Sequence, residues 1–207
     1  MGRRPPPGRH ALAVTARILL LRHAQSEWNA EGRWQGWADA PLSEDGRLHA
    51  LEAAGWIATL GIEAVACSDL RRASETAAVL ARAAGAAGPV VDARLREREI
   101  GWWSGLRTDE IVERWPGQLE AWREGRLARP PGGETDESVL VRARAALRRL
   151  AGEAASWVAV THGGLIGALE RATGVGRGPG TNLSGRWIHV AGDDLRPGDP
   201  VAAPLMP

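Results

Sequence analysis

The chain has 207 residues, of which 44% are hydrophobic and 25% charged, and this composition predicts one ordered domain and excludes general disorder. A net charge of +1, from 26 basic and 25 acidic residues, gives no general attraction to nucleic acid or to a membrane surface. All the basic residues are arginine, and the sequence has no lysine, phenylalanine or tyrosine, which excludes a Schiff-base or P-loop lysine and a catalytic tyrosine. The single cysteine, Cys67, cannot form an internal disulfide, and no Cys/His set has the spacing of zinc ligands.

Both ends of the chain are predicted to lie outside the domain. Residues 1–15 are expected to form a flexible tail rich in Arg, Pro and Gly, and residues 193–207 a second tail rich in Pro, Gly and Asp. The apolar run Ala11–Leu21 resembles a signal-peptide core, but Arg17 interrupts it and no small-residue cleavage site follows. No run reaches the ~18 consecutive apolar residues of a membrane span. We therefore expect a cytoplasmic protein whose domain covers residues 16–192.

Strand-like and helix-like segments alternate along this domain. Short apolar runs predict strands, and apolar residues at helical spacing predict helices. The predicted strands are Arg17–Arg22, Ala64–Cys67, Pro89–Val91, Trp157–Val160 and Arg186–Val190. The predicted helices are Glu44–Leu60, Leu70–Ala84, Asp109–Arg114, Leu119–Glu124, Thr135–Leu150 and Gly164–Thr173. This alternation is typical of a three-layer α/β/α sandwich with a mostly parallel central sheet.

Side-chain patterns add detail to the longer helices. Ser43 is expected to cap the first of them, and Ser68 or Asp69 the second. In the helix over 135–150, Arg142 and other arginines are expected to face outward. One face of the helix over 44–60 carries Leu48, Leu51, Ala54 and Ile57.

Polar groups follow three predicted strands, at ends that should meet along one edge of a parallel sheet. They are Arg22 with His23, Ser68–Arg72, and Thr161 with His162. Taken singly, each has a structural explanation, such as a hydrogen-bonded histidine, a solvated helix face or a strand-to-helix turn. Together, two arginines, two histidines and a helix N-terminus would repel one another unless an anion lies between them. Phosphate fits best, because the arginine fork matches its oxygens, and Glu97 in the loop after the third strand can reach the same place.

Six segments in order resemble motifs of the histidine phosphatase superfamily, also called the phosphoglycerate mutase-like family. The first resembles the family's RHG signature, and any one of the six, such as GGE, would be weak evidence alone. The segments are Leu19–Asn29, Gly32–Gly46, Ser68–Ala77, Leu95–Leu106, Pro131–Glu134 and Val160–Gly164.

The resemblance implies a phosphoglycerate mutase-like fold and a role for each matching residue, with no metal and no cofactor. It makes His23 the nucleophile that becomes phosphohistidine, and Glu97 the proton donor to the leaving oxygen and then the base for water. It implies that Arg22, Arg72 and His162 are catalytic residues as well. The residues implied to bind the phosphoryl group are Arg22, Asn29, Gln35, Gly36, Arg72, His162 and Gly163. Ala24 departs from the family, which usually has glycine there, so this loop must keep a negative φ or bear strain of order 1 kcal/mol.

The residues also support this chemistry without the family. An imidazole attacks phosphorus only when it is neutral, and the positive charges of Arg22 and Arg72 should lower the pKa of His23. A carboxylic acid beside the leaving oxygen is worth roughly 10²–10⁴ in rate. Because the pocket supplies its own cations, no metal is required.

Three functions remain open: a phosphatase, a phosphoglycerate mutase-type isomerase, and a non-catalytic phosphate-binding regulatory protein. Mutases of this family carry a longer insert between the acid and the second histidine, and a polar residue where Ile100 stands. Here only 65 positions separate Glu97 from His162. A short lid also protects a phosphorylated intermediate from water less well. The sequence therefore favours the phosphatase.

Substrate identity is expected to depend on a variable lid at about 102–133. Its tryptophans and arginines could form a wall that stacks on a sugar and holds a second anionic group, or they could be lid packing and a solvated face. These residues are Trp102, Trp103, Trp115, Trp122, Arg107, Arg114, Arg123, Arg126 and Arg129. Segments 122–134 and 161–169 are similar to the sugar-phosphoglycerate phosphatases of the family. We expect the partner to be a small phosphorylated metabolite, such as a sugar phosphate or sugar-phosphoglycerate, with no nucleic acid and no membrane, and leave a homodimer open.

Overall fold

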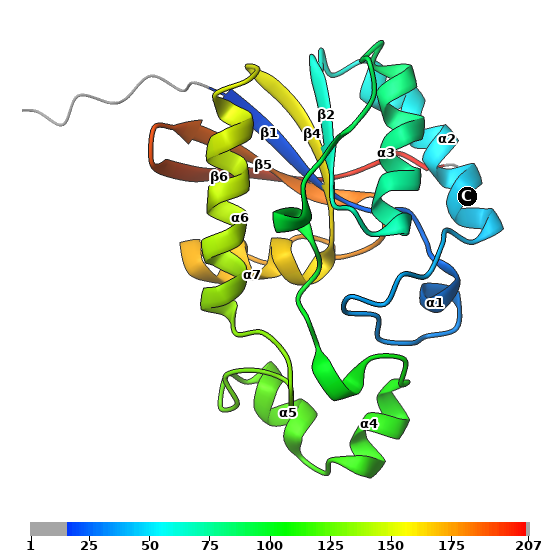
Figure 1. Ribbon diagram of the computed structural model, residues 1–207, viewed down its shortest axis with the longest axis vertical. Helices are drawn as coiled ribbons and strands as arrows, with labels where there is room; N and C mark the ends of the chain where they lie inside the picture. The colour runs from blue at the N-terminus through cyan, green and yellow to red at the C-terminus, as the bar shows by residue number, and fades with distance from the viewer. Residues whose placement is uncertain (1–15, 206–207) are drawn as a thin grey trace, which may run out of the picture.

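The computed structural model describes residues 16–205, which form a six-stranded sheet with helices on both faces (Figure 1). The tail expected at 1–15 lies outside the described residues. The strands are β1 (Ala16–Arg22), β2 (Ala64–Cys67), β3 (Val90–Val91), β4 (Ser156–Thr161), β5 (Ser184–Ala191) and β6 (Asp194–Ala202). The helices are α1 (Glu27–Ala30), α2 (Glu44–Ala58), α3 (Arg71–Ala83), α4 (Thr108–Arg114), α5 (Gln118–Arg123), α6 (Asp136–Ala151) and α7 (Gly163–Thr173), with 3₁₀ turns η1 (Ala93–Leu95) and η2 (Gly101–Trp103). Between residues 16 and 205, no helix is long and apolar enough to span a bilayer.

The strand order is β3-β2-β4-β1-β5-β6. β1, β2, β3 and β4 pair in parallel, whereas β5 is antiparallel to both β1 and β6. The central pair β1–β4 aligns Leu19 with Val158 and Leu21 with Val160, so apolar side chains of both strands share a face. The prediction of an α/β fold with a mostly parallel sheet is confirmed.

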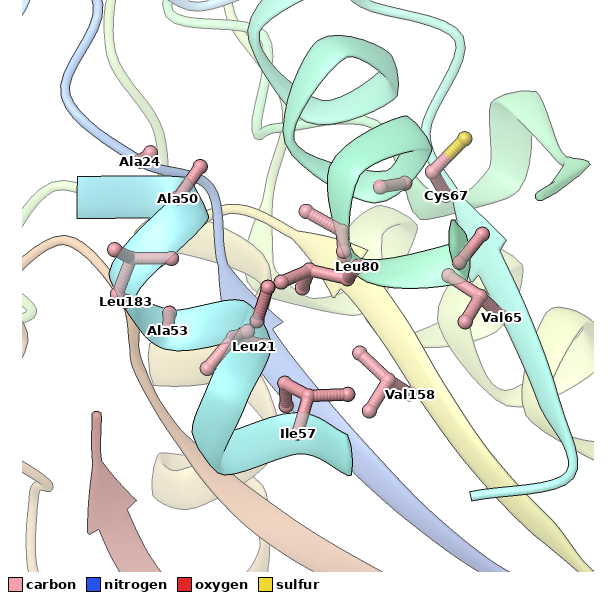
Figure 2. Packing of buried hydrophobic residues seen from close by; sticks show 14 of the residues in the cluster. Leu21, Ala24, Ala50, Ala53, Ile57, Val65, Cys67, Leu80, Val158 and Leu183 are labelled. Carbon is pink, nitrogen blue, oxygen red and sulfur yellow. The ribbon is translucent and has the colours of Figure 1, made fainter. Parts of the chain in front are cut away.

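Alternation along β1 explains why helices cover both faces of the sheet. Leu19 and Leu21 point into a cluster shared with α2 and α3, and Ile18 and Leu20 point into a second cluster shared with α6 and α7. Figure 2 shows the first cluster, in which Leu21 lies near Ile57 of α2. Two buried faces on one strand require a helical layer on each side, and this gives the predicted three-layer sandwich.

The structure differs from the expected C-terminal tail and shows which face of α2 is buried. Residues 193–207 were expected to form a tail, but Asp194–Ala202 pair with β5 as the edge strand β6. An edge strand tolerates Pro197 and Pro200, because one row of its N–H groups has no partner strand. In α2, Leu48 and Leu51 are 55% and 58% exposed, since the face against the sheet is made of smaller side chains. That face carries Gly46, Ala50, Ala53, Ala54 and Ile57.

Residues between η2 and α6, including α4 and α5, project beyond the ends of β1 and β4 (Figure 1). They pack on a separate apolar cluster around the fully buried Trp103. The two stems of this lid cross in close backbone contact. A Cβ on Gly101 would lie 2.2 Å from the carbonyl oxygen of Pro131, and one on Gly133 would lie 2.5 Å from that of Glu99. Glycine at both positions therefore allows the two segments that connect the lid to the rest of the domain to lie side by side.

Candidate active site

β1 delivers two predicted site residues to the edge where the parallel strands end. Arg22 is its last residue, and the N–H of His23 donates to the Thr161 carbonyl at 3.0 Å. His23 is 2% exposed, and its Nδ1 lies 2.6 Å from the carbonyl oxygen of Ala24. A carbonyl oxygen only accepts, so Nδ1 carries the proton and Nε2 keeps its lone pair. The ring is therefore in the tautomer that a nucleophile at Nε2 requires.

His162 and Arg72 lie in the same buried group. His162 follows β4, and its ring centroid lies 5.1 Å from that of His23. Arg72, the second residue of α3, is 1% exposed and donates through Nη1 to Ala38 O at 2.6 Å and through Nη2 to Gly36 O at 2.8 Å. Both ring nitrogens of His162 and the Nε of Arg72 have no hydrogen-bond partner within the described structure. Buried polar atoms rarely stay unpaired, so these nitrogens point to a ligand rich in acceptor oxygens.

The charges of this group favour neutral imidazoles and a bound anion. Burial lowers the pKa of His23 well below its ordinary value, and the positive charges of Arg72 and Arg22 lower it further. The pKa of His162 is lowered in the same way, by burial first and then by Arg72. Burial also lowers the pKa of Arg72 to about 10, while Glu97 opposes that change. An anion between the arginines would relieve this electrostatic cost.

Glu97 follows η1 and reaches the N-terminus of α7. Its Oε2 accepts from the N–H of Gly164 at 3.1 Å, and its Oε1 from the N–H of Arg98 at 2.7 Å. A Cβ on Gly164 would lie 2.3 Å from Oε1, so the carboxylate occupies space that only glycine leaves free. The second glycine after His162 therefore makes room for the predicted acid. For Gly163, a Cβ would make only ordinary contact with Arg22, at 3.6 Å.

The other residues predicted to bind the phosphoryl group, Gln35, Asn29 and Gly36, make hydrogen bonds of different kinds. The amide oxygen of Gln35 accepts from Ser26 Oγ at 3.0 Å, which leaves its NH₂ group as a donor. Asn29 turns its amide oxygen toward the backbone N–H of Ser26 at 3.2 Å. Gly36 contributes its carbonyl to Arg72, and its φ of +51° places it in the left-handed region.

A cavity of about 180 Å³ opens beside these residues. Its wall includes Arg22, Glu97 and Gly163, together with residues of α7 and of the loop at 177–180. Arg22 also donates to the carbonyl of Gly180, so this loop is tied to the site. The cavity thus lies on the α7 side of the predicted site, against Arg22 and Glu97.

Sequence reasoning missed residues that hold the site together. Asn182 donates to the His23 carbonyl at 2.9 Å, and Thr76 Oγ1 accepts from the N–H of Ala24 at 3.1 Å. Arg142, expected to face outward, instead turns inward and is largely buried, with its side chain 15% exposed. Its guanidinium donates to three backbone carbonyls in the loop that ends at Glu97, and also to the carboxylate of Glu134. These carbonyls are those of Arg94, Arg96 and Glu97, at 3.0, 2.6 and 2.8 Å.

The expected cap of α3 also differs. Asp69 forms an ion pair with Arg96 and Ser68 Oγ accepts from Leu70 N at 3.3 Å, so neither caps the first turn as expected. Asp39, distant in sequence, accepts from the N–H of Arg71 at 2.7 Å. The expected cap by Ser43 is present in α2.

Comparison with known proteins decides the family. The model of the histidine phosphatase superfamily (branch 1) matches residues 18–183. The chain belongs to the histidine phosphatase superfamily. The predicted family, and with it an enzyme of the histidine phosphatase type, is confirmed.

Several relatives of this histidine phosphatase are named glucosyl-3-phosphoglycerate phosphatase. The glucosyl-3-phosphoglycerate phosphatase of Mycobacterium tuberculosis is 37% identical over 193 residues, covering 83% of this chain and 86% of the relative. That of Mycolicibacterium vanbaalenii is 37% identical over 201 residues, covering 90% and 88%. A solved mycobacterial glucosyl-3-phosphoglycerate phosphatase complexed with VO₃ aligns with a TM-score of 0.79 at 33% identity, covering 88% of this chain and 96% of that one.

Several tryptophans and arginines of the lid of this histidine phosphatase are packed or paired, which is one of the two arrangements expected for them. Trp103 is fully buried, and Trp115 and Trp122 pack against the same cluster. Trp102 is exposed, at 67%. Two of the lid arginines, Arg114 and Arg126, are paired with Glu110 and Glu124. From residue 16 to residue 205, no group of three or more His, Cys, Asp or Glu side chains could hold a metal ion.

Proposed function

We propose that this protein hydrolyses the phosphomonoester of a sugar-phosphoglycerate or a similar small metabolite through a phosphohistidine at His23. The observation that carries the proposal is the His23 ring, held by the Ala24 carbonyl as a neutral imidazole with Nε2 free. Arg22, Arg72 and His162 surround it, and the Nε of Arg72 and both ring nitrogens of His162 have no hydrogen-bond partner among the described residues. Such a site neutralises charge on a transferring phosphoryl group.

In the first step, His23 Nε2 attacks phosphorus and the bond between phosphorus and the ester oxygen breaks. Glu97, in its protonated form, gives its proton to the leaving alkoxide. The equatorial oxygens of the phosphoryl group accept hydrogen bonds from Arg22, Arg72 and His162, with Gln35, Asn29 and the Gly163 N–H as further donors. These contacts act most strongly on the charge of the transition state.

In the second step, water attacks the phosphorus of phosphohistidine. The Glu97 carboxylate takes a proton from this water, the N–P bond breaks, and inorganic phosphate leaves. His23 returns to its neutral form and Glu97 to its protonated form. No further reactant is needed.

The substrate class is supported by the relatives. Proteins named glucosyl-3-phosphoglycerate phosphatase match 83% and 90% of this chain, whereas a protein named probable phosphoglycerate mutase matches 73% at 34% identity. Hydrolysis is thus favoured over isomerisation.

The test is rapid quenching during turnover of a ³²P-labelled phosphomonoester. We expect label on the protein that is lost in acid and kept in alkali, and that maps to His23. In His23→Ala both the label and turnover should fall by about 10³-fold or more, with the circular dichroism spectrum of the folded protein unchanged. His49→Ala, on α2 away from the site, is the control. A His23→Ala enzyme that kept more than a few per cent of activity would show that the nucleophile is another group.

A second pair of assays separates the functions. Incubation with 3-phosphoglycerate, with and without bisphosphoglycerate, should release phosphate and form no isomer. Formation of 2-phosphoglycerate would show a mutase, and binding of phosphate without turnover would show a regulatory protein. Glu97→Gln should slow alkyl phosphates far more than p-nitrophenyl phosphate, whose leaving group needs no proton. Equal slowing of both would count against Glu97 as the acid.

A further inference from the structure

The cavity beside the catalytic group is bordered by a glycine-rich loop that the mechanism does not use. This loop, residues 176–180, reads Gly-Arg-Gly-Pro-Gly and connects α7 to β5. Arg177 lines the cavity on the same wall as Arg22 and Glu97. The volume of about 180 Å³ exceeds the ~30 Å³ share of one water molecule, so the cavity has room for part of a substrate.

Hydrogen bonds on alternate residues hold this loop in place. Arg186 Nη2 donates to the Gly176 carbonyl at 2.6 Å, and the Gly178 N–H donates to Glu170 Oε1 at 3.0 Å. Arg22 binds the carbonyl of Gly180. The backbone on both sides of Arg177 is therefore fixed by the buried core and by the active site.

The acidic residues of this wall are already engaged. Glu170 is 5% exposed and pairs with Arg186 at 2.9 Å. Both oxygens of Glu97 accept backbone N–H groups. Across residues 16–205, by contrast, no ion pair or hydrogen bond of the Arg177 side chain is found, and the residue is exposed. The pKa of Arg22 is lowered first by burial and also by the positive charge of Arg177, so the two guanidinium groups share one electrostatic environment.

We propose that Arg177, on the anchored loop 176–180, binds the carboxylate of a phosphoglycerate-type substrate while its phosphoryl group lies at His23. This subsite deepens the proposed function and rests on it. It places the second anionic group at the α7–β5 loop, whereas the lid arginines contribute nothing to this cavity wall within the described residues. A guanidinium fork matches a carboxylate in two parallel hydrogen bonds.

The test compares two substrates that differ only in the group concerned. 3-Phosphoglycerate carries a carboxylate where glycerol 3-phosphate carries a CH₂OH group. In Arg177→Gln, kcat/KM for 3-phosphoglycerate should fall about ten- to hundred-fold, chiefly through KM. Its value for glycerol 3-phosphate should change by no more than about two- to three-fold. The matched control is Arg123→Gln, an exposed lid arginine without an ion pair among the described residues, and it should change neither value.

Three results would overturn the subsite: an equal loss on both substrates, no loss on either, or a selective loss in Arg123→Gln instead. Calorimetric titration of 3-phosphoglycerate into His23→Ala, with and without Arg177→Gln, measures binding without turnover. Suppose that the wild-type enzyme formed no phosphohistidine, but that adding Arg177→Gln to His23→Ala still weakened the binding of 3-phosphoglycerate. The proposed function would then fail and the subsite would stand. If turnover proceeded through His23 and binding were unaffected, the subsite alone would fail.

Discussion

Ala24 follows the predicted nucleophile at a position where this family usually has glycine. Its φ is not positive: in residues 16–205, Leu183, with φ 55°, is the one residue other than glycine in that region. The Ala24 side chain is fully buried beside Ala50 (Figure 2), while its N–H and carbonyl are bonded to Thr76 and His23. The backbone thus orients the imidazole and the methyl group fills the core, so neither function needs glycine.

The two glycines after His162 look equivalent in sequence but have different surroundings. A Cβ on Gly164 would lie 2.3 Å from Glu97 Oε1, whereas one on Gly163 would lie no closer than 3.6 Å to Arg22. Gly164→Ala should therefore displace the Glu97 carboxylate and lower kcat for alkyl phosphates about 10²-fold, the lower end of the range for a general acid. Gly163→Ala should stay within about three-fold. Steady-state kinetics on both variants checks this, and equal effects would contradict the assigned place of Glu97.

The buried histidines also make stability depend on pH. In the unfolded chain His23 and His162 bind protons near pH 6.5, but in the folded state the pKa of each is held well below that value. As pH falls below about 6.5, the unfolded state therefore binds more protons, and the free energy of unfolding must decrease. Each histidine can contribute up to about 1.4 kcal/mol per pH unit, and this contribution ends once the folded pKa is passed.

Urea unfolding at intervals from pH 7.5 to pH 5, in buffers without phosphate, measures this slope. His162→Gln should remove about half of it. A free energy of unfolding that stayed constant from pH 7 to pH 5.5 would mean that these imidazoles are not held neutral.

At the scale of elements, α6 positions the loop that carries Glu97. Arg142 is the point of contact, because its guanidinium binds three carbonyls up to and including that of Glu97 and pairs with Glu134 at 2.8 Å. Glu134 in turn accepts from the N–H of Glu99 at 2.9 Å. The loop that carries the predicted acid is thus held by a helix none of whose residues lines the cavity.

Arg142→Lys keeps the charge but cannot reach four acceptors with one planar group. We expect kcat for alkyl phosphates to fall about ten- to hundred-fold, while p-nitrophenyl phosphate, which needs no acid, loses no more than about three-fold. Arg142→Ala should also destabilise the fold by about 3–5 kcal/mol, since it leaves a partly buried carboxylate unpaired. Arg144→Lys, exposed on the same helix, is the control. Equal losses on both substrates would mean that Arg142 is structural only.

Local patterns predict the elements but not their longer-range contacts. The strands β1, β2 and β4 could be predicted because each is a short apolar run, and their ends predict the position of the candidate site. The cap of α3 could not, because Asp39 comes from a loop far away in sequence. Arg142 lies at helical spacing from arginines that are exposed, so its sequence pattern predicts an exposed side chain. It turns inward because the loop that carries Glu97 passes beside it and offers carbonyl groups to its guanidinium. The exposure of Leu48 likewise follows from which face of α2 packs on the sheet, and that face carries Ala50, Ala53 and Ile57.

At the scale of the whole molecule, the sheet has a helix-covered core on each face, and the lid has its own. Trp34, Trp103 and Trp122 meet edge to face, with ring centroids 5.7–5.9 Å apart, so the lid is packed independently of the sheet. Arg98 lies over Trp122 and pairs with Asp136 at the start of α6, and this contact joins the lid to the main body. The lid therefore has a packed core of its own, and among the described residues it contributes no arginine to the wall of the cavity.

The edge strand β6 links the far end of the chain to the proposed subsite. Arg186 of β5 binds Gly198 of β6 at 2.6 Å as well as Gly176 and Glu170, so the loop that carries Arg177 depends on β6. A chain that ends at Gly192 loses the bond from Arg186 to Gly198 and the hydrogen-bonded pairing of β5 with β6, and it exposes β5 as a new edge. At about 1 kcal/mol for each lost hydrogen bond, we expect its free energy of unfolding to fall by about 3 kcal/mol or more.

A chain that ends at Ala203 keeps β6 and its bond from Ala203 N to Leu183 O at 2.9 Å, and it is the matched control. It should lose no more than about 1 kcal/mol. If the shorter chain still folds, its KM for 3-phosphoglycerate should rise more than its KM for glycerol 3-phosphate, because Arg186, which binds the Gly176 carbonyl, loses its own contact with Gly198. Urea unfolding and steady-state kinetics measure both effects. Equal stability of the two truncated chains would show that β6 adds nothing to the domain, and that the Arg186 contacts to Gly176 and Glu170 suffice to hold the loop.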